Sequence, residues 1–149
     1  MGSGMKMKAD SCTIRLAGGE DGAALAGLFG QLGYQTRADE VVARLLAPDP
    51  ATEVLLASLG SEVLGVLVWH RLQPLHVACA WGLISALVID EAARGSGIGT
   101  SLLATAEVRA LAQGCSQLEL SSSLKREGAH RFYLGQGYLE HPKRFVKVL

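Results

Sequence analysis

Residues 83–99 of the chain read LISALVIDEAARGSGIG, and an alanine- and leucine-rich segment follows as far as Leu111. Nearly every position over 83–89 is apolar, which predicts a buried strand. Leu103, Ala106 and Ala110 then recur at steps of three or four, so a helix is expected from Gly99 onward. Together these segments predict a strand, a glycine-rich turn and a helix.

The glycine-rich turn has the properties of an anion-binding site. The first backbone N–H groups of a helix lack internal partners, and the helix dipole adds partial positive charge there. Glycines let a phosphate come close, and the planar donor fork of Arg94 would suit a pyrophosphate. The alternative is a strand-to-helix turn that binds no ligand, in which the glycines only permit the backbone conformation.

Composition indicates one domain with a substantial core, because the 149 residues are 49% hydrophobic. Fourteen basic and fourteen acidic residues give a formal net charge of zero, which argues against a nucleic-acid-binding protein. Cys12, Cys79 and Cys115 are odd in number and widely spaced. They suggest neither a disulfide framework nor a metal site, so a reducing cytoplasm is expected and no metal ligand is assigned.

The chain start and the hydropathy give two further expectations. Residues 1–12 lack the apolar core of a signal peptide and are expected to be a disordered or vector-derived start, with the domain over 13–149. No run of eighteen apolar residues free of charge occurs, so no membrane span is expected.

The remaining segments predict a mixed α/β (α+β) fold, a central sheet flanked by helices. A short helix is predicted to open at Thr36, with Asp39 three residues later, and to end before Pro48. The connection over 71–80 is expected to be irregular, and residues 138–149 predict a final pair of strands around His141-Pro142. The other expected elements are strands at 13–16, 54–59, 63–70 and 117–121, with a hairpin at 60–61, and helices at 20–33 and 127–134.

Three phosphate-binding patterns compete for the turn. A Walker loop needs a lysine before its Ser or Thr, and Gly99-Thr100 has none. A dinucleotide fingerprint needs a third glycine where this chain has Leu102. The third pattern is Arg-x-x-Gly-x-Gly, which Arg94, Gly97 and Gly99 match directly after a strand and at the start of a helix.

This third pattern resembles the pyrophosphate loop of the GNAT superfamily of acyl-CoA-dependent N-acetyltransferases. Residues 129–133, AHRFY, followed by Gly137-Tyr138, resemble that superfamily's second signature, a helix that carries a tyrosine near the coenzyme sulfur. The resemblance covers roughly residues 13–149 and implies a single GNAT-type domain. From His70 onward the chain resembles aminoalkylphosphonate N-acetyltransferases in particular, for example in AHRFYL at 129–134.

The resemblance implies transfer of acetyl from acetyl-CoA to a primary amine of a small molecule, by direct attack in a ternary complex. It implies that Tyr133 protonates the departing coenzyme thiolate, and that an N–H near Val88 polarises the thioester carbonyl. The implied coenzyme-binding residues are Leu87, Val88, Ile89, Arg94, Gly95, Ser96, Gly97, Ile98, Gly99, Thr100 and Ser123.

Several alternatives stay open at this point. His70 and His76 are candidate bases because histidine is a common proton acceptor in enzymes, and Glu119 is a further candidate, although packing or solvent exposure is the commoner explanation for each. The acidic residues that relatives often carry on the strand before the loop are here Leu83 and Ala86. The acceptor is alternatively an aminoglycoside, a polyamine or a protein N-terminus, or the chain is a non-catalytic acyl-CoA-binding sensor. The final strands leave a homodimer open.

Overall fold

The strands of the chain form one mixed sheet in the order β1-β2-β3-β4-β5. The computed structural model describes residues 11–121, 127–141 and 144–149. Strands β1 to β4 pair antiparallel, and β5 joins β4 in parallel. The strands are β1 (Thr13–Leu16), β2 (Thr52–Leu59), β3 (Glu62–Leu72), β4 (Ala80–Ile89) and β5 (Cys115–Leu120).

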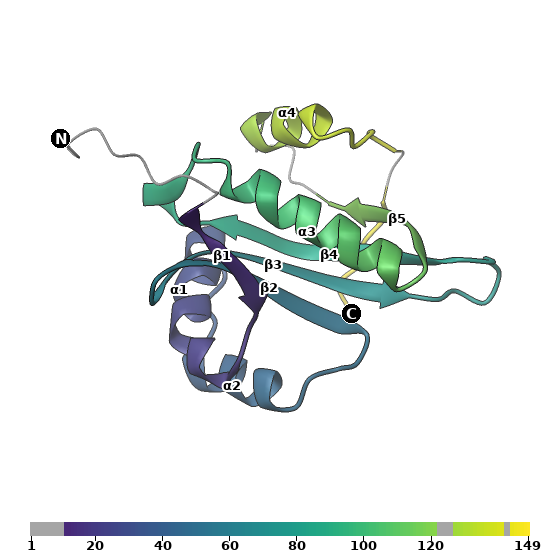
Figure 1. Cartoon of the computed structure of the whole chain (residues 1–149). Coiled ribbons are helices and arrows are strands. Elements are labelled where there is room, and N and C mark those ends of the chain that lie inside the picture. Colours follow the sequence, from purple (N-terminus) through teal and green to yellow (C-terminus); the bar gives the residue numbers. More distant parts are fainter. Residues whose placement is uncertain (1–10, 122–126, 142–143) are drawn as a thin grey trace.

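Helices cover both faces of this sheet. Helices α1 (Gly22–Leu32) and α2 (Ala38–Leu46) lie on one face, and α3 (Ile98–Ala112) and α4 (Glu127–Gly135) lie on the other (Figure 1). Leu56, Val66 and Val88 pack towards α1 and α2, whereas neighbouring positions of the same strands pack towards α3. Both faces are therefore buried, which explains the nearly continuous apolar runs of β2, β3 and β4. None of the described helices has the length and apolar character needed to cross a membrane.

Strand β4 contains an irregularity at Ser85. Val68 of β3 pairs with Ala86 and the next residue, Trp69, pairs with Ile84, so Ser85 is the extra residue of a β-bulge. The bulge changes the alternation of side chains, because Ile84 joins the core on the α3 side and Val88 joins the core on the α1 side. An even spacing in a regular strand would have placed both on one face.

The second half of β4 also separates from β5. The parallel pairing of these strands runs from Ala80 to Ile84 and stops there. Within the described part of the chain, residues 85–89 therefore have a strand neighbour on the β3 side alone. The buried strand predicted over 83–89 is consequently open to solvent at Ser85.

Most predicted elements are confirmed, including the unit of strand, glycine turn and helix and the hairpin between β2 and β3. Two predictions in the first 90 residues need correction. β4 begins at Ala80, because pairs such as Leu72 with Trp81 extend its ladder with β3, so the irregular connection is shorter than predicted. Thr36 does not cap α2: the helix starts after Arg37, whose guanidinium binds the Asp39 carboxylate at 3.0 Å.

The predicted final pair of strands is not formed in the described residues 138–141 and 144–149. Phe145 and Val148 are 90% and 92% exposed, and residues 144–149 do not pack on the sheet. An apolar, β-branched sequence shows that a segment suits a sheet, but a strand also needs a hydrogen-bonding neighbour. The prediction was wrong for these residues because composition does not supply that neighbour. Residues 1–10 lie outside the described part, so the expected disordered start stays a prediction.

Candidate active site

The turn between β4 and α3 is built for close approach of a ligand. It contains a short 3-10 helix, η3 (Glu91–Ala93), followed by Gly95 and Gly97 with φ angles of +79° and +88°. Such left-handed conformations favour glycine. Gly97 is the N-cap of α3 and has no side chain to satisfy the first amide groups of the helix. Because the first N–H groups of a helix have no partners within the helix, this turn has the features that the predicted anion site requires.

A groove of about 780 Å³ lies beside this turn, a size typical of sites for small ligands. It runs along the second half of β4, across the glycine turn and under α4. The structure thus brings together most of the residues that the sequence resemblance had singled out. Those lining the groove are Leu87, Val88, Ile89, Arg94, Gly95, Gly97, Ile98, Gly99, Thr100 and Tyr133.

Among the described residues, one predicted coenzyme contact, Ser96, is absent from that lining. The hydroxyl of Ser96 donates a hydrogen bond to the carbonyl of Ala93, so this side chain closes the turn instead of facing the groove. Ser123 lies outside the described residues, and its predicted contact with the coenzyme stays a prediction.

Arg94 stands at the mouth of the groove. Its Nε donates to the carbonyl oxygen of Ile89 at 3.3 Å, and the side chain is otherwise exposed. The guanidinium is therefore positioned by one bond to the backbone and keeps most of its donors for a ligand. Together with the glycine turn, this arrangement fits a pyrophosphate group.

Gln31, which the sequence did not indicate, forms another wall of the groove. Its Nε2 donates to Asp90 Oδ1 at 2.9 Å, and its Oε1 accepts from the backbone N–H of Glu91 at 3.1 Å. These bonds fix the end of α1 against the end of β4. Since Gln31 and Asp90 are 59 positions apart, no local pattern predicts the contact.

Helix α4 brings Tyr133 to the groove. It packs on the start of α3, where a Cβ added to Gly99 would lie 3.2 Å from Phe132 Cζ. The Tyr133 ring lies edge-on to Phe132 and to Tyr138, with centroid distances of 5.4 and 6.3 Å. Tyr138 in turn donates to Glu107 at 3.0 Å, and burial and that carboxylate raise the pKa of Tyr138. This aromatic cluster determines where Tyr133 stands.

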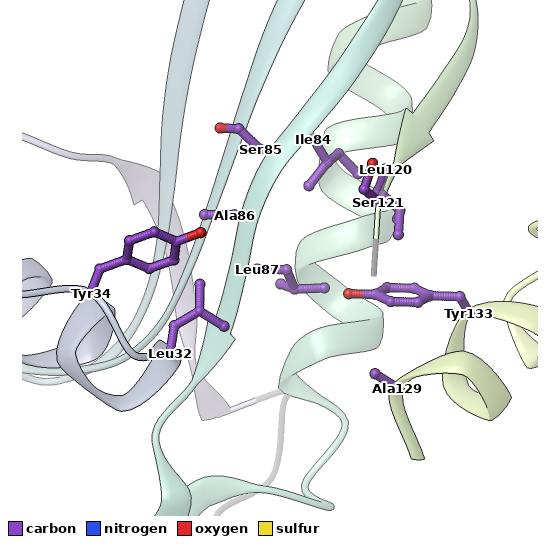
Figure 2. Close-up of a pocket in the computed structure, with 10 residues that line it drawn as sticks. All are labelled: Leu32, Tyr34, Ile84, Ser85, Ala86, Leu87, Leu120, Ser121, Ala129 and Tyr133. Carbon is purple, nitrogen blue, oxygen red and sulfur yellow. The ribbon is translucent and has the colours of Figure 1, made fainter. Parts of the chain in front are cut away.

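A second cavity, of about 250 Å³, adjoins the groove. Leu32, Leu87, Ala129 and Tyr133 line both spaces, so the two meet at Tyr133. Figure 2 shows the hydroxyl groups of Tyr34 and Tyr133 pointing towards β4 from opposite sides. The site thus has a long compartment and a small one, with a phenol between them.

The three candidate bases lie in different surroundings. His76, in the connection between β3 and β4, and Glu119, on β5, are exposed and line neither space. His70 is hydrogen-bonded to Ser85, which lines the small cavity. Ala86 lines that cavity as well, so this part of β4 does face the site although it carries no carboxylate.

Comparison with known proteins identifies the family. The sequence model of the acetyltransferase (GNAT) family matches residues 23–138, which include the glycine turn and Tyr133. The chain belongs to the acetyltransferase (GNAT) family. Members of this family use acetyl-CoA as their co-substrate, so the chain is an acetyl-CoA-dependent acetyltransferase. The predicted family, fold class and enzyme class are confirmed.

Individual relatives of this GNAT protein are named for different roles. The aminoalkylphosphonate N-acetyltransferase of Salmonella typhimurium strain LT2 is 39% identical over 143 residues, which are 93% of this chain and 92% of the relative. A transcriptional regulator from Bacillus halodurans superposes with a TM-score of 0.82 at 24% identity, covering 93% of this chain and 99% of that one. An aminoglycoside acetyltransferase from a soil metagenomic sample, in complex with sisomicin, superposes with a TM-score of 0.80 at 16% identity, covering 94% and 97%. At such identities the two solved structures show the fold alone.

Proposed function

We propose that this GNAT protein acetylates the primary amine of a small molecule by direct attack in a ternary complex. The observation that carries the proposal is the junction of two spaces at Tyr133. The larger groove begins at the glycine turn and suits the long coenzyme, whereas the small cavity suits a compact acceptor. Two substrates entering from these sides would meet without a covalent enzyme intermediate.

The glycine turn and Arg94 would hold the pyrophosphate of the coenzyme, and β4 would hold its pantetheine arm. The N–H of Asp90 donates to Leu64 on β3 at 2.8 Å. Because the backbone groups of an antiparallel strand point to alternate sides, those of Leu87 and Ile89 face away from β3. The Ile89 carbonyl confirms this direction by accepting from Arg94. The Leu87 carbonyl and the N–H groups of Leu87 and Ile89 would therefore face a ligand bound where β4 separates from β5.

Tyr133 would act as the acid of the reaction. Bound acetyl-CoA supplies a thioester carbonyl carbon that a neutral amine can attack. The N–C bond forms, the C–S bond breaks, and the Tyr133 hydroxyl donates a proton to the sulfur. Ordinary pKa values of about 10 for a phenol and about 8.5 for a thiol permit this transfer once the groups are held together. A backbone N–H near Val88 would stabilise charge on the carbonyl oxygen.

The first acceptor class to test is an aminoalkylphosphonate, since the Salmonella relative bears that name and is 39% identical over nearly the whole chain. A small acceptor is also consistent with a cavity of about 250 Å³. Aminoglycosides, polyamines and protein N-termini are the competing acceptors, and a sensor that binds acetyl-CoA without turnover is the competing class.

The experiment is to measure release of the coenzyme thiol with a panel of amines of matched chain length. Aminoalkylphosphonates, aminoalkylsulfonates and amino alcohols would be compared with and without a divalent cation, beside a polyamine, an aminoglycoside and a peptide. We expect the largest kcat/KM with aminoalkylphosphonates. Activity confined to other amines would remove the phosphonate assignment, and acetyl-CoA binding without thiol release for any amine would favour the sensor.

A further inference from the structure

We propose that Ser85 removes a proton from the acceptor ammonium and passes its own hydroxyl proton to His70, with Thr52 positioning the imidazole ring. This inference rests on the proposed function and supplies the base that the reaction requires. In it Ser85 is the catalytic residue, since its hydroxyl would touch the amine. His70 and Thr52 are positioning residues, since they act through Ser85.

The three side chains form a continuous hydrogen-bonded chain across three strands. Thr52 on β2 and His70 on β3 are directly paired, and Thr52 Oγ1 lies 2.8 Å from His70 Nδ1. On the other side of the ring, His70 Nε2 lies 2.7 Å from Ser85 Oγ on β4. Both ring nitrogens are thus engaged, so the orientation of the imidazole is fixed.

The hydrogen-bonded series of Thr52, His70 and Ser85 ends in the small cavity. Ser85 is exposed and lines that cavity, whereas His70 and Thr52 are partly buried behind it. Figure 2 shows Ser85 on the same side of β4 as Tyr34, with Tyr133 on the opposite side. An amine in the small cavity would therefore lie between the hydroxyl of Ser85 and the end of the coenzyme groove.

The bulge in β4 explains why a serine is presented at this point. Ser85 is the extra residue between the pairs Val68–Ala86 and Trp69–Ile84. Bulges re-aim side chains and occur next to active sites more often than elsewhere. His70 is also a polar residue at the end of an otherwise apolar stretch of β3 from Leu64 to Trp69. A role confined to sheet packing would not require a histidine with both nitrogens hydrogen-bonded.

Among the described residues, the charged side chains next to Thr52 and His70 in sequence have other hydrogen-bond partners. Glu53, next to Thr52, binds Arg109, and Arg71, next to His70, donates to the carbonyl of Gln113. Since neighbouring positions of a strand face opposite sides, these charges lie across the sheet from His70. The titratable groups that line the small cavity with Ser85 are Tyr34 and Tyr133.

The proton transfers balance. In the tautomer that carries hydrogen on Nδ1, His70 donates to Thr52 Oγ1, and Nε2 accepts the Ser85 hydroxyl proton as Ser85 Oγ takes one from the ammonium. The neutral amine then attacks, and the coenzyme sulfur receives its proton from Tyr133. A second proton, lost by the amine nitrogen as the amide forms, restores Tyr133. The imidazolium releases the first proton to solvent, so one proton leaves per amide formed.

The test compares Ser85→Ala, Ser85→Thr and His70→Gln with His76→Gln, which changes an exposed histidine outside both spaces. With an amine that the wild type acetylates, we expect kcat/KM near neutral pH to fall about 100-fold in Ser85→Ala and His70→Gln. Ser85→Thr should recover much of this loss, and His76→Gln should behave as wild type. Activity of the wild type separately tests the proposed function.

The pH profile separates proton transfer from a structural role. Without the relay only amine that is already neutral reacts, and alkylammonium groups titrate near pH ~10. The rates of Ser85→Ala and His70→Gln should therefore approach wild type at alkaline pH. An equal loss at every pH, or no loss near neutrality, would overturn the proposal.

Two further readouts are independent of turnover. We expect the ¹⁵N signals of the His70 ring to show hydrogen on Nδ1 in the wild type, and the Nε2 signal to change in Ser85→Ala. Calorimetry should give the same acetyl-CoA affinity for all variants. An unchanged Nε2 signal in a folded Ser85→Ala protein would show that the hydrogen bond does not exist and would overturn the relay.

Discussion

The two ends of helix α3 differ in how far nearby hydrogen-bonding groups have partners within the protein. The start of α3 is called the open end below, and the last turns, where Arg109 binds Glu53, are called the closed end. At its start the N-cap is Gly97, and the Arg94 side chain donates one hydrogen bond of 3.3 Å to the Ile89 carbonyl among the described residues. At its end Arg109 forms two bonds of 2.6 Å with the carboxylate of Glu53, which also accepts from Trp69 and Gln113. One end thus leaves donors available to a ligand, and the other end satisfies them internally.

This difference shows how the fold keeps an open site rigid. The pair of Glu53 and Arg109 fastens the last turns of α3 to β2, and Arg109 also sits where the helix dipole favours a cation. Hydrogen bonding to Arg109 is the main reason why the pKa of Glu53 is lowered. A helix anchored at one end can present unpartnered amides at the other without a large loss of stability. Changes at the two ends should therefore separate function from stability.

The largest effect is expected at the open end, from Tyr133→Phe. Loss of the phenolic proton should lower kcat about 100-fold while the affinity for acetyl-CoA stays unchanged, because the ring still fills its place. Steady-state kinetics and calorimetry would measure the two quantities. Tyr138→Phe is the matched control, since it removes a hydroxyl bound to Glu107 outside both spaces. Wild-type turnover in Tyr133→Phe would remove the acid assignment.

At the closed end, Glu53→Ala should lower the free energy of unfolding by about 2 kcal/mol. The substitution leaves Arg109 and the indole N–H of Trp69 without their carboxylate partner. Urea unfolding would measure the change. Asp39→Ala is the control: it breaks an exposed ion pair with Arg37, which water screens, and should change stability far less than Glu53→Ala does. Equal effects of the two substitutions would contradict the anchoring role of Glu53.

A smaller effect is expected from Arg94→Ala, again at the open end. Loss of the guanidinium should weaken acetyl-CoA binding about 10-fold, equivalent to about 1.4 kcal/mol, with little change in stability. Arg94→Lys should lie between the two, because it keeps the charge and loses the planar fork. Calorimetric dissociation constants would decide, and an unchanged constant in Arg94→Ala would show that the turn binds without this side chain.

The smallest expected effect is a pH dependence of the stability that Glu53 contributes at the closed end of α3. In the folded chain the pKa of Glu53 is below its ordinary value of 4.5. Its contribution to the free energy of unfolding is therefore fully present at pH values above 4.5. The contribution is lost as the pH falls through the folded pKa. The stability difference between wild type and Glu53→Gln should accordingly be constant between pH 7 and about 5.5, and should shrink below about pH 4. Unfolding midpoints across this range would test it, and a difference that grows on acidification would contradict the pairing.

Sequence alone determined the parts of this protein that local chemistry dictates. The glycines before α3 mark a left-handed turn that few other residues adopt, and the apolar runs mark strands covered on both faces. The same local patterns carried the family resemblance, and they placed Tyr133 on a helix. They also indicated a final pair of strands, wrongly for the described residues, because strand pairing depends on a neighbour that no local pattern contains.

Tertiary structure alone decided what lies next to what. Three features join residues from separate elements. They are the bulge at Ser85, the hydrogen bond from Gln31 to Asp90 and the meeting of the groove and the small cavity at Tyr133. His70 looked like any strand histidine in the sequence, and the folded sheet places it between Thr52 and Ser85. The physical reason is that hydrogen bonds and cavities depend on distances in space, which the chain acquires only when the sheet and its helices pack.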